Sequence, residues 1–584
     1  MGSLQRVLIA NRGEIAVRVI RACRELGVYP VAVYGGGEER SRHVRLADEA
    51  HRIPDGDRLP YLNIDAIVAI ALRANAQAIH PGYGFLSENA DFALACGRSG
   101  LIFVGPTPGA IEAMGDKVRA RAIALQAGVP IVPGADASVP SREAAYEWAE
   151  QIGFPVAIKA AGGGGGRGFR IAPRPEDLAA AFDGAAGEAS RYFGNPTVYL
   201  ERYLPRPRHV EVQIFADGHG DIVALGERDC SVQRRHQKLI EETPSPAVDH
   251  HLRTSLFNAA IALARAVEYS GAGTVEFLVA EDGSFYFLEM NTRIQVEHTI
   301  TEETTGIDLV REQLLVAAGN ALSFRQTEIE ARGHAIQCRI NAEDAGRGFA
   351  PTPGVLTAYQ EPGGFGVRVD SAMEPGAEIM PAYDSLIAKL VAWGRDRDEA
   401  IARMRRALGE FRIEGVPSTI PFHQRVFMNE AFVRRGATTA FLDEHPDVLP
   451  EPAAVPDDAA RETPSAWREV LVEVNGRQLS VRVNGDPLSQ PNRAQRTAPK
   501  RPVHASRGST AVANEEKLRS PIQGTVLRVA AKTGTRVEAG DLICVIEAMK
   551  MENEIRAHRL GEVVELPIVQ GGTVKIGDLL AVIR

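Results

Sequence analysis

The chain of 584 residues is too long for a single hydrophobic core, and its length suggests roughly three or four domains. With 45% hydrophobic and 24% charged residues and no apolar run near 18 residues, its composition is that of a globular protein and excludes a membrane span. A net charge of -9 gives no electrostatic reason to bind nucleic acid or an anionic membrane, so small molecules and proteins are the expected partners.

The N-terminus and the cysteines indicate a cytoplasmic location. MGSLQRVLIANRGE lacks the layout of a signal peptide, and Arg6 does not fit the N-myristoylation pattern. The five cysteines are scattered without a CxxC pair, which argues against structural zinc and against a disulfide framework. We therefore expect reduced thiols.

Short apolar runs alternate with helical segments from Gln5 onward. RVLIA is followed by the helical pattern EIAVRVIRACRELG and then by YPVAVY, AQAIHPG and LIFVGP. This order predicts βαβ units and a parallel sheet wrapped by helices. After about Pro155 the pattern changes to mixed strands and helices with glycine-rich turns, and it continues to about Glu444.

A glycine loop lies between two predicted strands in VAIKAAGGGGGRGFRIA. Its glycines match GxGxxG, but a dinucleotide fold requires a helix after the loop, and the absence of GK[ST] excludes a Walker A motif. A glycine run between antiparallel strands can form a flap whose N–H groups approach phosphates, with Lys159 supplying charge. A flexible hairpin is the alternative.

The segment TVEFLVAEDGSFYFLEMNTRIQVEH predicts two strands that bring glutamates together. A two-residue turn at 282–283 would pair Glu281 with Ser284 and would place Glu276 opposite Glu289. Because carboxylates directly across a ladder repel, the pair predicts a bound cation, and hard oxygen ligands favour Mg²⁺ or Mn²⁺. A solvated strand face of mixed charge is the alternative, but it leaves the paired glutamates unexplained.

If this strand stays extended, alternate residues share one face. That face would carry Glu289, Asn291, Arg293, Gln295 and Glu297. The opposite face would carry Met290, Ile294 and Val296. The first face thus offers metal ligands, a fixed cation, an amide and a carboxylate.

Beyond Glu444 the composition predicts a linker, a hairpin and a tether. The stretch from His445 to about Trp467 is rich in Pro, Ala and Asp, and REVLVEV and RQLSVRV, joined by Asn475-Gly476, predict a β-hairpin. The following segment, DPLSQPNRAQRTAPKRPVHASRGSTAVANEE, cannot bury enough apolar surface to fold and is expected to be mobile.

The C-terminal segment contains an internal repeat with an offset of 37 residues. GTVLRVAAKTGTRVEAGDLICVI, starting at Gly524, matches GEVVELPIVQGGTVKIGDLLAVI, starting at Gly561. We predict that the copies form halves of one small β structure. EAMKMENE lies between them, so Lys550 is expected at an exposed hairpin tip.

EAMKM, with Lys550 at its centre, closely resembles the biotin attachment motif of biotinyl domains. A lipoyl domain or an unmodified turn is the alternative, although lipoyl domains usually lack the flanking methionines. Upstream, several motifs in order resemble biotin carboxylase, an ATP-grasp enzyme: LIANRGEIAVRV, HPGYGFLSEN, MGDK, KAAGGGGGRG, GERDCSVQRRHQK, FLEMNTRIQVEH and GHAIQCRINAED. Together with the carrier segment, the chain resembles the alpha subunit of acyl-CoA carboxylases.

The resemblance implies a multidomain α/β and α+β fold with an all-β biotinyl barrel-sandwich domain. The implied domains are a Rossmann-like pre-ATP-grasp domain (1–115), an ATP-grasp domain with a glycine-rich lid (116–330), a biotin carboxylase C-terminal domain (331–446), a linker with a small hairpin (447–515) and a biotinyl carrier domain (516–584).

The resemblance also implies the site residues. ATP would be bound by Lys117, Lys159, Gly165, Gly166, Glu201, Leu204, His209, Gln233 and His236. Divalent metal would be held by Glu276, Glu289 and Asn291. Bicarbonate would be bound by Lys238, Arg293, Gln295 and Val296. Glu297 would be the general base, Arg339 would stabilise the biotin enolate, and Lys550 would carry biotin.

The implied reaction is ATP-dependent carboxylation of biotin by bicarbonate through carboxyphosphate, giving carboxybiotin. The implied partners are a separate carboxyltransferase beta subunit, a biotin protein ligase, and a second copy in a homodimer or a higher assembly. The acyl acceptor, which could be acetyl-, propionyl-, longer acyl- or methylcrotonyl-CoA, would be chosen by the other subunit.

One departure and three alternatives stand beside this interpretation. Gly35-Gly36-Gly37 occupies a turn where relatives usually carry Ser and Asp, and the short hairpin is interpreted as a docking element. The alternatives are a carboxylate–amine ligase, a non-catalytic carrier, and a pyruvate or urea carboxylase subunit.

Overall fold

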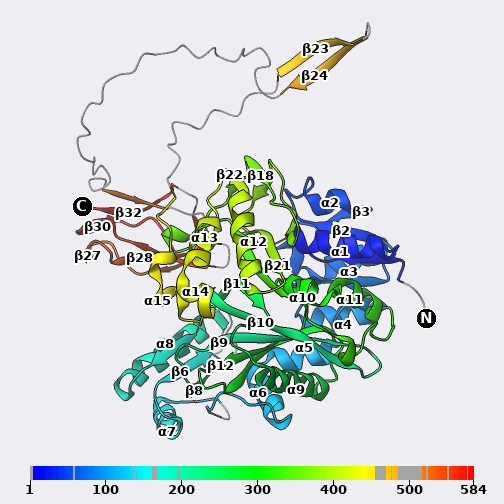
Figure 1. The fold of residues 1–584 in the computed structure, drawn as a ribbon. Coiled ribbons are helices and arrows are strands. Elements are labelled where there is room, and N and C mark those ends of the chain that lie inside the picture. Colours follow the sequence, from blue (N-terminus) through cyan, green and yellow to red (C-terminus); the bar gives the residue numbers. More distant parts are fainter. Residues whose placement is uncertain are drawn as a thin grey trace. The chain divides into compact units, whose positions relative to one another are not determined.

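The computed structural model describes residues 4–56, 59–135, 138–160, 168–193, 197–453, 468–474, 477–483, 516–520, 524–548, 551–574 and 577–584. They divide into two compact units, one built mainly from Met1–Glu451 and one mainly from the residues that follow. Each unit is described by itself (Figure 1).

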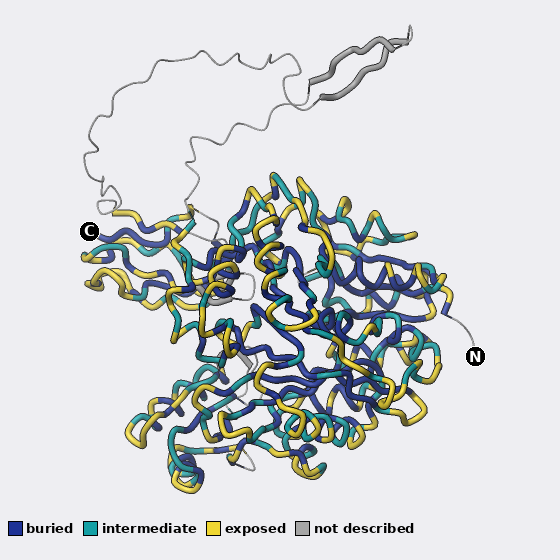
Figure 2. Tube along the Cα trace, in the orientation of Figure 1, coloured by how far each residue is buried: buried dark blue, intermediate teal, exposed yellow. Residues whose placement is uncertain are grey.

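The N-terminal part is a parallel sheet in the order β3-β2-β1-β4-β5, as the βαβ pattern predicts. Its strands are β1 (Arg6–Ile9), β2 (Tyr29–Tyr34), β3 (Glu49–Arg52), β4 (Ala78–His80) and β5 (Ile102–Phe103). Its main helices are α1 (Gly13–Glu25), α3 (Ile64–Arg73) and α4 (Ala90–Arg98). Val7 and Ile9 pack into one core and Leu8 into another, so both faces of the sheet are covered (Figure 2).

A small three-stranded sheet, in the order β7-β6-β8, follows in the chain. Strands β6 (Val156–Ala160) and β7 (Phe169–Ala172) are antiparallel, which confirms the two predicted strands. Strand β8 (Val198–Arg202) and the helices α7 (Arg142–Ile152) and α8 (Leu178–Phe193) complete this subdomain. Gly165 and Gly166 lie outside the described residues.

The largest element is an antiparallel sheet of eight strands in the order β13-β12-β9-β10-β11-β14-β21-β19. The strands are β9 (Arg208–Ala216), β10 (Ile222–Arg234), β11 (Gln237–Thr243), β12 (Gly271–Val279), β13 (Phe285–Asn291), β14 (His334–Asn341), β19 (Val367–Ser371) and β21 (Leu386–Gly394). Because β11 pairs with β14, the sheet runs without a break across the predicted division at residue 330.

Several helices pack against this sheet. The helices α5 (Pro108–Gly115), α6 (Lys117–Gln126) and α9 (His250–Ala266) pack near β9 and β13, and α10 (His298–Thr305) packs on β10, β11, β14 and β21. Further elements are α2 (Arg42–Leu46), α11 (Leu309–Ala317), α14 (Glu430–Arg435), α15 (Phe441–Glu444), β15 (Glu343–Asp344), β16 (Ala350–Pro351), β17 (Gly354–Val355), β18 (Ala358–Gln360), β20 (Glu378–Ile379) and β22 (Arg412–Glu414).

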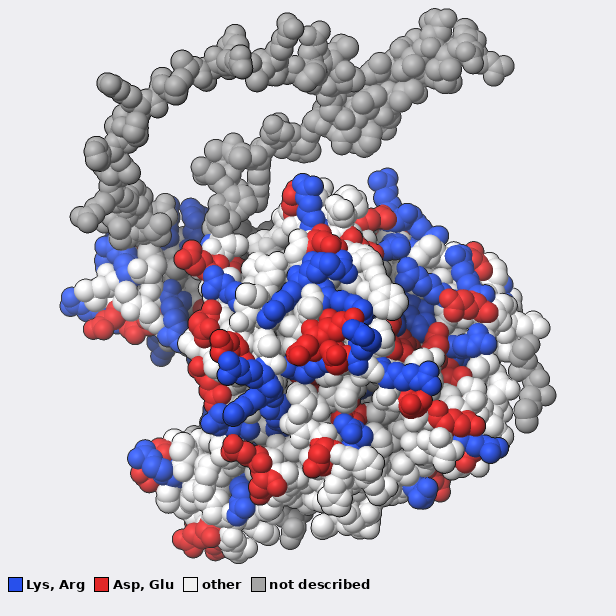
Figure 3. Space-filling view, in the orientation of Figure 1, with Lys and Arg blue, Asp and Glu red and all other residues white. Residues whose placement is uncertain are grey.

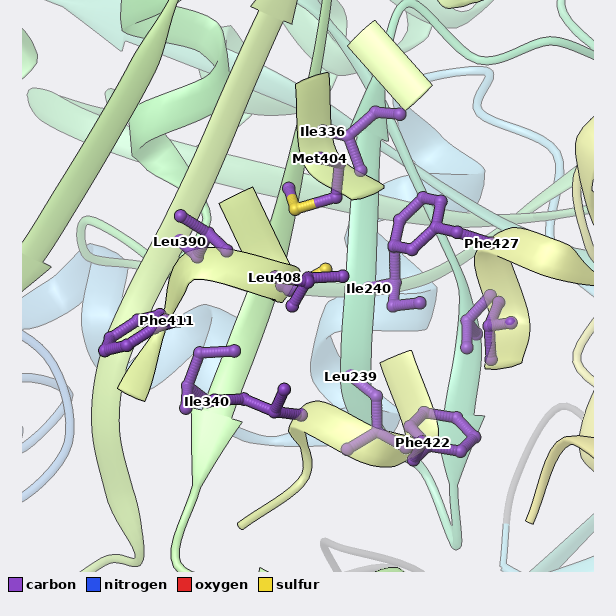
Figure 4. Close-up of a cluster of buried hydrophobic side chains, with 14 of the residues drawn as sticks. Leu239, Ile240, Ile336, Ile340, Leu390, Met404, Leu408, Phe411, Phe422 and Phe427 are labelled. Carbon is purple, nitrogen blue, oxygen red and sulfur yellow. The ribbon is translucent and has the colours of Figure 1, made fainter. Parts of the chain in front are cut away.

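The core of the C-terminal part lies between this sheet and the helices α12 (Arg397–Glu410) and α13 (Ile420–Met428). Figure 4 shows Ile240 of β11, Ile336 of β14 and Leu390 of β21 pointing toward Met404 of α12 and Phe427 of α13. This apolar packing holds together three neighbouring strands, of which β11 is far from β14 and β21 in the sequence.

Glu242→Gln is expected to lower the free energy of unfolding by about 3–5 kcal/mol. The buried Glu242 carboxylate accepts a hydrogen bond from Arg397 Nε (2.6 Å) and contacts His334 Nε2 (2.9 Å). Burial raises the pKa of Glu242, but the hydrogen bond with His334 and the charge of Arg397 together hold it below its ordinary value. Glutamine would leave the half-buried Arg397 without this counter-charge.

The same change predicts a pH dependence. Because the carboxyl has a lower pKa when folded, its stabilisation is present above the unfolded pKa of about 4.3 and is lost as the pH falls below it. Thermal unfolding should therefore separate the variant from wild type at pH 7 and less so below about pH 4. Glu330→Gln, in an exposed ion pair with Arg332, is the control and should cost under about 1 kcal/mol. Equal melting temperatures at pH 7 would contradict the prediction.

The C-terminal repeat forms two four-stranded sheets, β25-β32-β30-β27 and β29-β28-β26-β31. The strands are β25 (Lys517–Arg519), β26 (Gly524–Val529), β27 (Arg536–Val537), β28 (Leu542–Ala548), β29 (Met551–Arg556), β30 (Gly561–Glu565), β31 (Thr573–Val574) and β32 (Leu579–Ile583). The pair Val526↔Ile546 recurs as Val563↔Ile583, each residue 37 positions later, and both strand pairs carry an irregularity at the same place. The predicted two-fold β structure is confirmed, whereas Lys550 lies outside the described residues.

The predicted hairpin is also present. Strands β23 (Arg468–Val474) and β24 (Arg477–Val483) are antiparallel, and Val474 pairs with Arg477.

All five cysteines are buried and form no disulfide. Among the described residues, no helix has the length and apolar character needed to cross a membrane. Figure 3 shows Lys and Arg interspersed with Asp and Glu on the face that it draws.

Candidate active site

A cleft of about 1090 Å³ lies within the first unit, and its walls come from the N-terminal part, the small sheet and the large sheet. It is lined by every described residue that the sequence analysis assigns to the site: Lys117, Lys159, Glu201, Leu204, His209, Gln233, His236, Lys238, Glu276, Glu289, Asn291, Arg293, Gln295, Val296, Glu297 and Arg339. Residues more than 200 positions apart in the sequence thus meet in one cavity.

Glu276 of β12 and Glu289 of β13 face each other as predicted, but the turn and the strand register that bring them together differ from the prediction. Glu276 pairs with Glu289, whereas the predicted pairing of Glu281 with Ser284 is wrong. The turn holds three residues, because Ala280 donates its N–H to the Ser284 carbonyl (2.8 Å). An irregularity between Glu276 and Phe277 shifts the register by one residue and restores the opposition.

The glutamate pair belongs to a longer row across four neighbouring strands. Glu289 of β13 lies opposite Glu276 of β12, which lies opposite Glu211 of β9, which lies opposite Arg228 of β10. Glu211 and Arg228 are missing from the predicted site. The alternation of polar residues in HVEVQ was a signal for Glu211, since it places His209, Glu211 and Gln213 on one face.

Lys238 of β11 places a positive charge among these carboxylates. Its Nζ donates hydrogen bonds to Glu276 (2.8 Å) and Glu297 (2.7 Å) and also to Glu211. Burial would lower the pKa of Lys238, but the three carboxylates hold it well above its ordinary value. The ammonium group is therefore charged at any physiological pH.

Glu297 lies between two cations. Arg339 Nη2 donates to Glu297 Oε2 (2.8 Å), and Arg339 Nε donates to Glu241 Oε1 (2.6 Å). Burial would raise the pKa of Glu297, but Lys238, Arg339 and Arg228 hold it well below its ordinary value. Glu297 is therefore ionised and can accept a proton from an acid held in the cleft.

Three oxygen-bearing side chains could hold a divalent cation: Glu276, Glu289 and Asn291. Burial and the charge of Glu276 raise the pKa of Glu289, so a cation between the two carboxylates would relieve their repulsion. Asn291 Nδ2 donates to Glu276 Oε1 (2.8 Å), which turns its Oδ1 outward toward Arg293 Nη2 (2.8 Å). Carboxylate and amide oxygens are ligands that Mg²⁺ prefers, so these residues fit the predicted metal.

Glu289→Gln is expected to raise the Mg²⁺ concentration for half-maximal activity, because it removes one of two anionic ligands. Glu281→Gln, at the exposed turn of the same strand pair, is the matched control and should leave it unchanged. Titration of Mn²⁺ binding in the presence of ADP checks the effect without catalysis. Equal metal affinity in Glu289→Gln and wild type would show that Glu289 is not a ligand.

The face predicted beyond Glu289 is only partly correct. The strand ends at Asn291 and the chain bends before α10 begins at His298. Arg293 and Glu297 still line the cleft, and Met290 and Ile294 are buried in apolar cores as predicted. Val296 lines the cleft too, so its predicted place on the opposite face is wrong. Strict alternation fails because the backbone is no longer extended.

The end of the cleft that is lined by Lys117, Lys159 and His236 is rich in basic side chains. Lys159 forms an ion pair with Glu201, which also contacts Arg121 Nη1 (3.2 Å). Burial and the charges of Lys159, His209 and Lys117 lower the pKa of His236. Such a positive end suits a polyphosphate, and Arg121, which is not among the residues that line the cleft, contacts Glu201 of that end.

The glycine-rich turn at 35–37 lies next to Tyr383, which lines this cleft. A Cβ at Gly35 would come within 2.8 Å of the Tyr383 hydroxyl, and Tyr383 is a lining residue. Gly37 adopts a φ of +87°, which L side chains rarely adopt. Glu38, which follows the turn, accepts a hydrogen bond from Arg12 Nε (2.5 Å), and Arg12 also lines the cleft.

Four family profiles match the chain. They are Biotin carboxylase, N-terminal domain (residues 3–111), Carbamoyl-phosphate synthase L chain, ATP binding domain (116–325), Biotin carboxylase C-terminal domain (337–444) and Biotin-requiring enzyme (516–583). The biotin-dependent acyl-coenzyme A carboxylase alpha3 subunit of Mycobacterium leprae is 44% identical over 591 residues, which covers 100% of this chain and 99% of that protein. The chain belongs to the biotin-dependent carboxylases.

Two further relatives each match about three quarters of the chain. Biotin carboxylase 1 of Bacillus subtilis is 52% identical, covering 76% of this chain and 99% of that protein. The biotin carboxylase domain dimer of Hydrogenobacter thermophilus 2-oxoglutarate carboxylase, solved with MgADP and bicarbonate, is 47% identical with a TM-score of 0.75, covering 77% of this chain and 99% of that one.

These matches confirm the predicted fold class and the resemblance to acyl-CoA carboxylase alpha subunits. The chain therefore has a biotin carboxylase portion that includes an ATP-binding domain, followed by a domain of biotin-requiring enzymes.

Proposed function

We propose that this chain carboxylates biotin on Lys550 with bicarbonate and ATP, through carboxyphosphate, for transfer to an acyl-CoA by a separate carboxyltransferase subunit. The observation that carries the proposal is the placement of an ionised Glu297 between Lys238 and Arg339, next to the carboxylates that fit a metal. A carboxylate base beside two cations suits the deprotonation of a bound anion.

Each residue has a proposed role. Lys117, Lys159, Glu201, Leu204, His209, Gln233 and His236, with the loop at Gly165 and Gly166, would bind ATP. Glu276, Glu289 and Asn291 would hold Mg²⁺, which neutralises the phosphate charge when bound. Lys238, Arg293, Gln295 and Val296 would bind bicarbonate.

The proposed chemistry assigns the protons and charges as follows. Glu297 accepts the bicarbonate proton while the γ-phosphoryl group of ATP is transferred to a bicarbonate oxygen, with ADP leaving. Arg293 and Lys238 hold the anion in line for this transfer. Carboxyphosphate then breaks to CO₂ and phosphate, and the phosphate takes the N1 proton of biotin. Arg339, which cannot lose its proton, stabilises the ureido anion that attacks CO₂ to give carboxybiotin.

The proposed partners follow from the carrier and from the relatives. A carboxyltransferase beta subunit would complete the reaction, a biotin protein ligase would modify Lys550, and the biotin carboxylase portion would form a homodimer or a higher assembly. The full-length match favours an acyl-CoA over pyruvate as the final acceptor.

The hairpin β23–β24 is proposed to dock the partner, and the domains are proposed to divide at residues 115, 330, 446 and 515. A cytoplasmic location stays a prediction from the sequence.

ADP release by the purified chain tests the proposal. We expect ADP release to require bicarbonate and to increase when free biotin is added. ATP cleavage that needs an amine and not bicarbonate would instead favour a carboxylate–amine ligase.

A further inference from the structure

Arg228 of β10 is a buried cation that the proposed chemistry does not use. Its side chain is completely buried, and it is not among the residues that line the cleft. Nevertheless its guanidinium group ends the row of three carboxylates that begins at Glu289. Because a buried charge is costly unless it is paired and hydrogen-bonded, the partners of Arg228 indicate what the side chain does.

All five N–H donors of Arg228 are engaged. Nε donates to Glu211 Oε1 (2.5 Å), and Nη1 donates to Gln213 Oε1 (2.7 Å) and to Thr301 Oγ1 (2.9 Å). Nη2 donates to Thr274 Oγ1 (3.1 Å) and to Gln295 Oε1 (2.7 Å). The planar group is thus fixed by its neighbours and can in turn fix them.

The contact with Gln295 has a directional consequence. A guanidinium group has no acceptor, so only the amide oxygen of Gln295 can face it. The amide Nε2 must therefore point the other way, and it donates to Glu276 Oε1 (2.8 Å). Without Arg228, the amide could turn over and present its oxygen to the carboxylates and to any anion in the cleft.

We infer that Arg228 is a positioning residue for the anion subsite: it holds the Gln295 amide so that its N–H group, and not its oxygen, faces bicarbonate. The inference rests on the proposed function, because it takes bicarbonate as the anion at Gln295. Arg228 itself touches no substrate, so its effect must be transmitted through Gln295.

Arg228→Lys tests the inference in the full-length chain. Lysine keeps the charge but lacks the planar fork that reaches both Glu211 and Gln295, so the KM for bicarbonate should rise roughly tenfold. The KM for ATP should change less than about twofold, since the ATP end of the cleft does not contact Arg228. Thr301→Val, which removes an Arg228 contact that does not involve Gln295, should leave the KM for bicarbonate near the wild-type value.

A double-mutant cycle separates positioning from a general structural role. In a Gln295→Ala background, Arg228→Lys should cause no further rise in the KM for bicarbonate, because the group that it orients is absent. If the double variant instead raised the KM for bicarbonate by the product of the two single increases, the inference would be overturned. Equal rises of the bicarbonate and ATP KM values in Arg228→Lys would overturn it as well.

A wild-type structure with MgADP and bicarbonate gives a test that needs no variant. Gln295 should bridge Arg228 and the bound bicarbonate, and a Gln295 that has left Arg228 would overturn the inference. If the wild-type chain shows no bicarbonate-dependent ATP cleavage, the proposed function fails and this inference fails with it. If the wild-type chain is active and the bicarbonate KM of Arg228→Lys is unchanged, the inference alone fails.

Discussion

Glu297→Gln is expected to reduce bicarbonate-dependent ATP cleavage roughly 100- to 10,000-fold, the usual contribution of a general base. Glutamine has nearly the same shape but cannot accept the bicarbonate proton. It would also remove the negative charge that lies between Lys238 and Arg339 at 2.7 and 2.8 Å. Steady-state release of ADP as a function of bicarbonate concentration measures the loss, and ADP binding should remain close to wild type.

Glu241→Gln is the matched control for this experiment. Glu241 also accepts a hydrogen bond from Arg339 (2.6 Å) and is fully buried, but it does not line the cleft. Its replacement removes a charge next to the same arginine without removing a base, so we expect a loss of less than about tenfold. If Glu297→Gln retained more than a tenth of wild-type activity, Glu297 would not be the base.

Lys550→Arg is expected to abolish carboxyl transfer while ATP cleavage with free biotin continues. Arginine keeps the positive charge but its guanidinium group is not an acceptor for the biotinyl group. Intact mass after incubation with a biotin ligase should show one biotinyl group on the wild-type chain and none on the variant. Product formation with the carboxyltransferase partner should fall to background.

Lys532→Arg is the control for the carrier. Lys532 is an exposed lysine in the same domain, and its replacement should leave the biotinyl group in place. A Lys550→Arg chain that still gains a biotinyl group would show that another lysine is the attachment site. A wild-type chain that gains a lipoyl group in place of biotin would favour the lipoyl alternative.

Much of the fold could be predicted from local patterns. Alternating apolar runs and helical segments predicted the parallel N-terminal sheet, and the repeat offset of 37 residues predicted the two-fold β structure with matching strand pairs. These predictions succeed because helix and strand periods, and repeated segments, are properties of neighbouring residues.

The pairing of Glu276 with Glu289 could be predicted from the sequence, but the turn that connects their strands could not. It was predicted correctly, but the assumed two-residue turn is a three-residue turn, and an irregularity after Glu276 compensates for the difference. Turn length and strand irregularities depend on packing against neighbouring strands, so the residues of the turn did not determine the register on their own.

The sequence by itself determined the types of residue available to the site: the paired glutamates, the Arg293 to Glu297 run and the carrier lysine at 550. Only the tertiary structure decided how they meet. It placed Glu211 and Arg228 in one row with Glu276, and it brought Lys238 onto three carboxylates from different segments. Strand order and sheet register set these contacts, and both are fixed by interactions between segments far apart in the chain, which no local pattern contains.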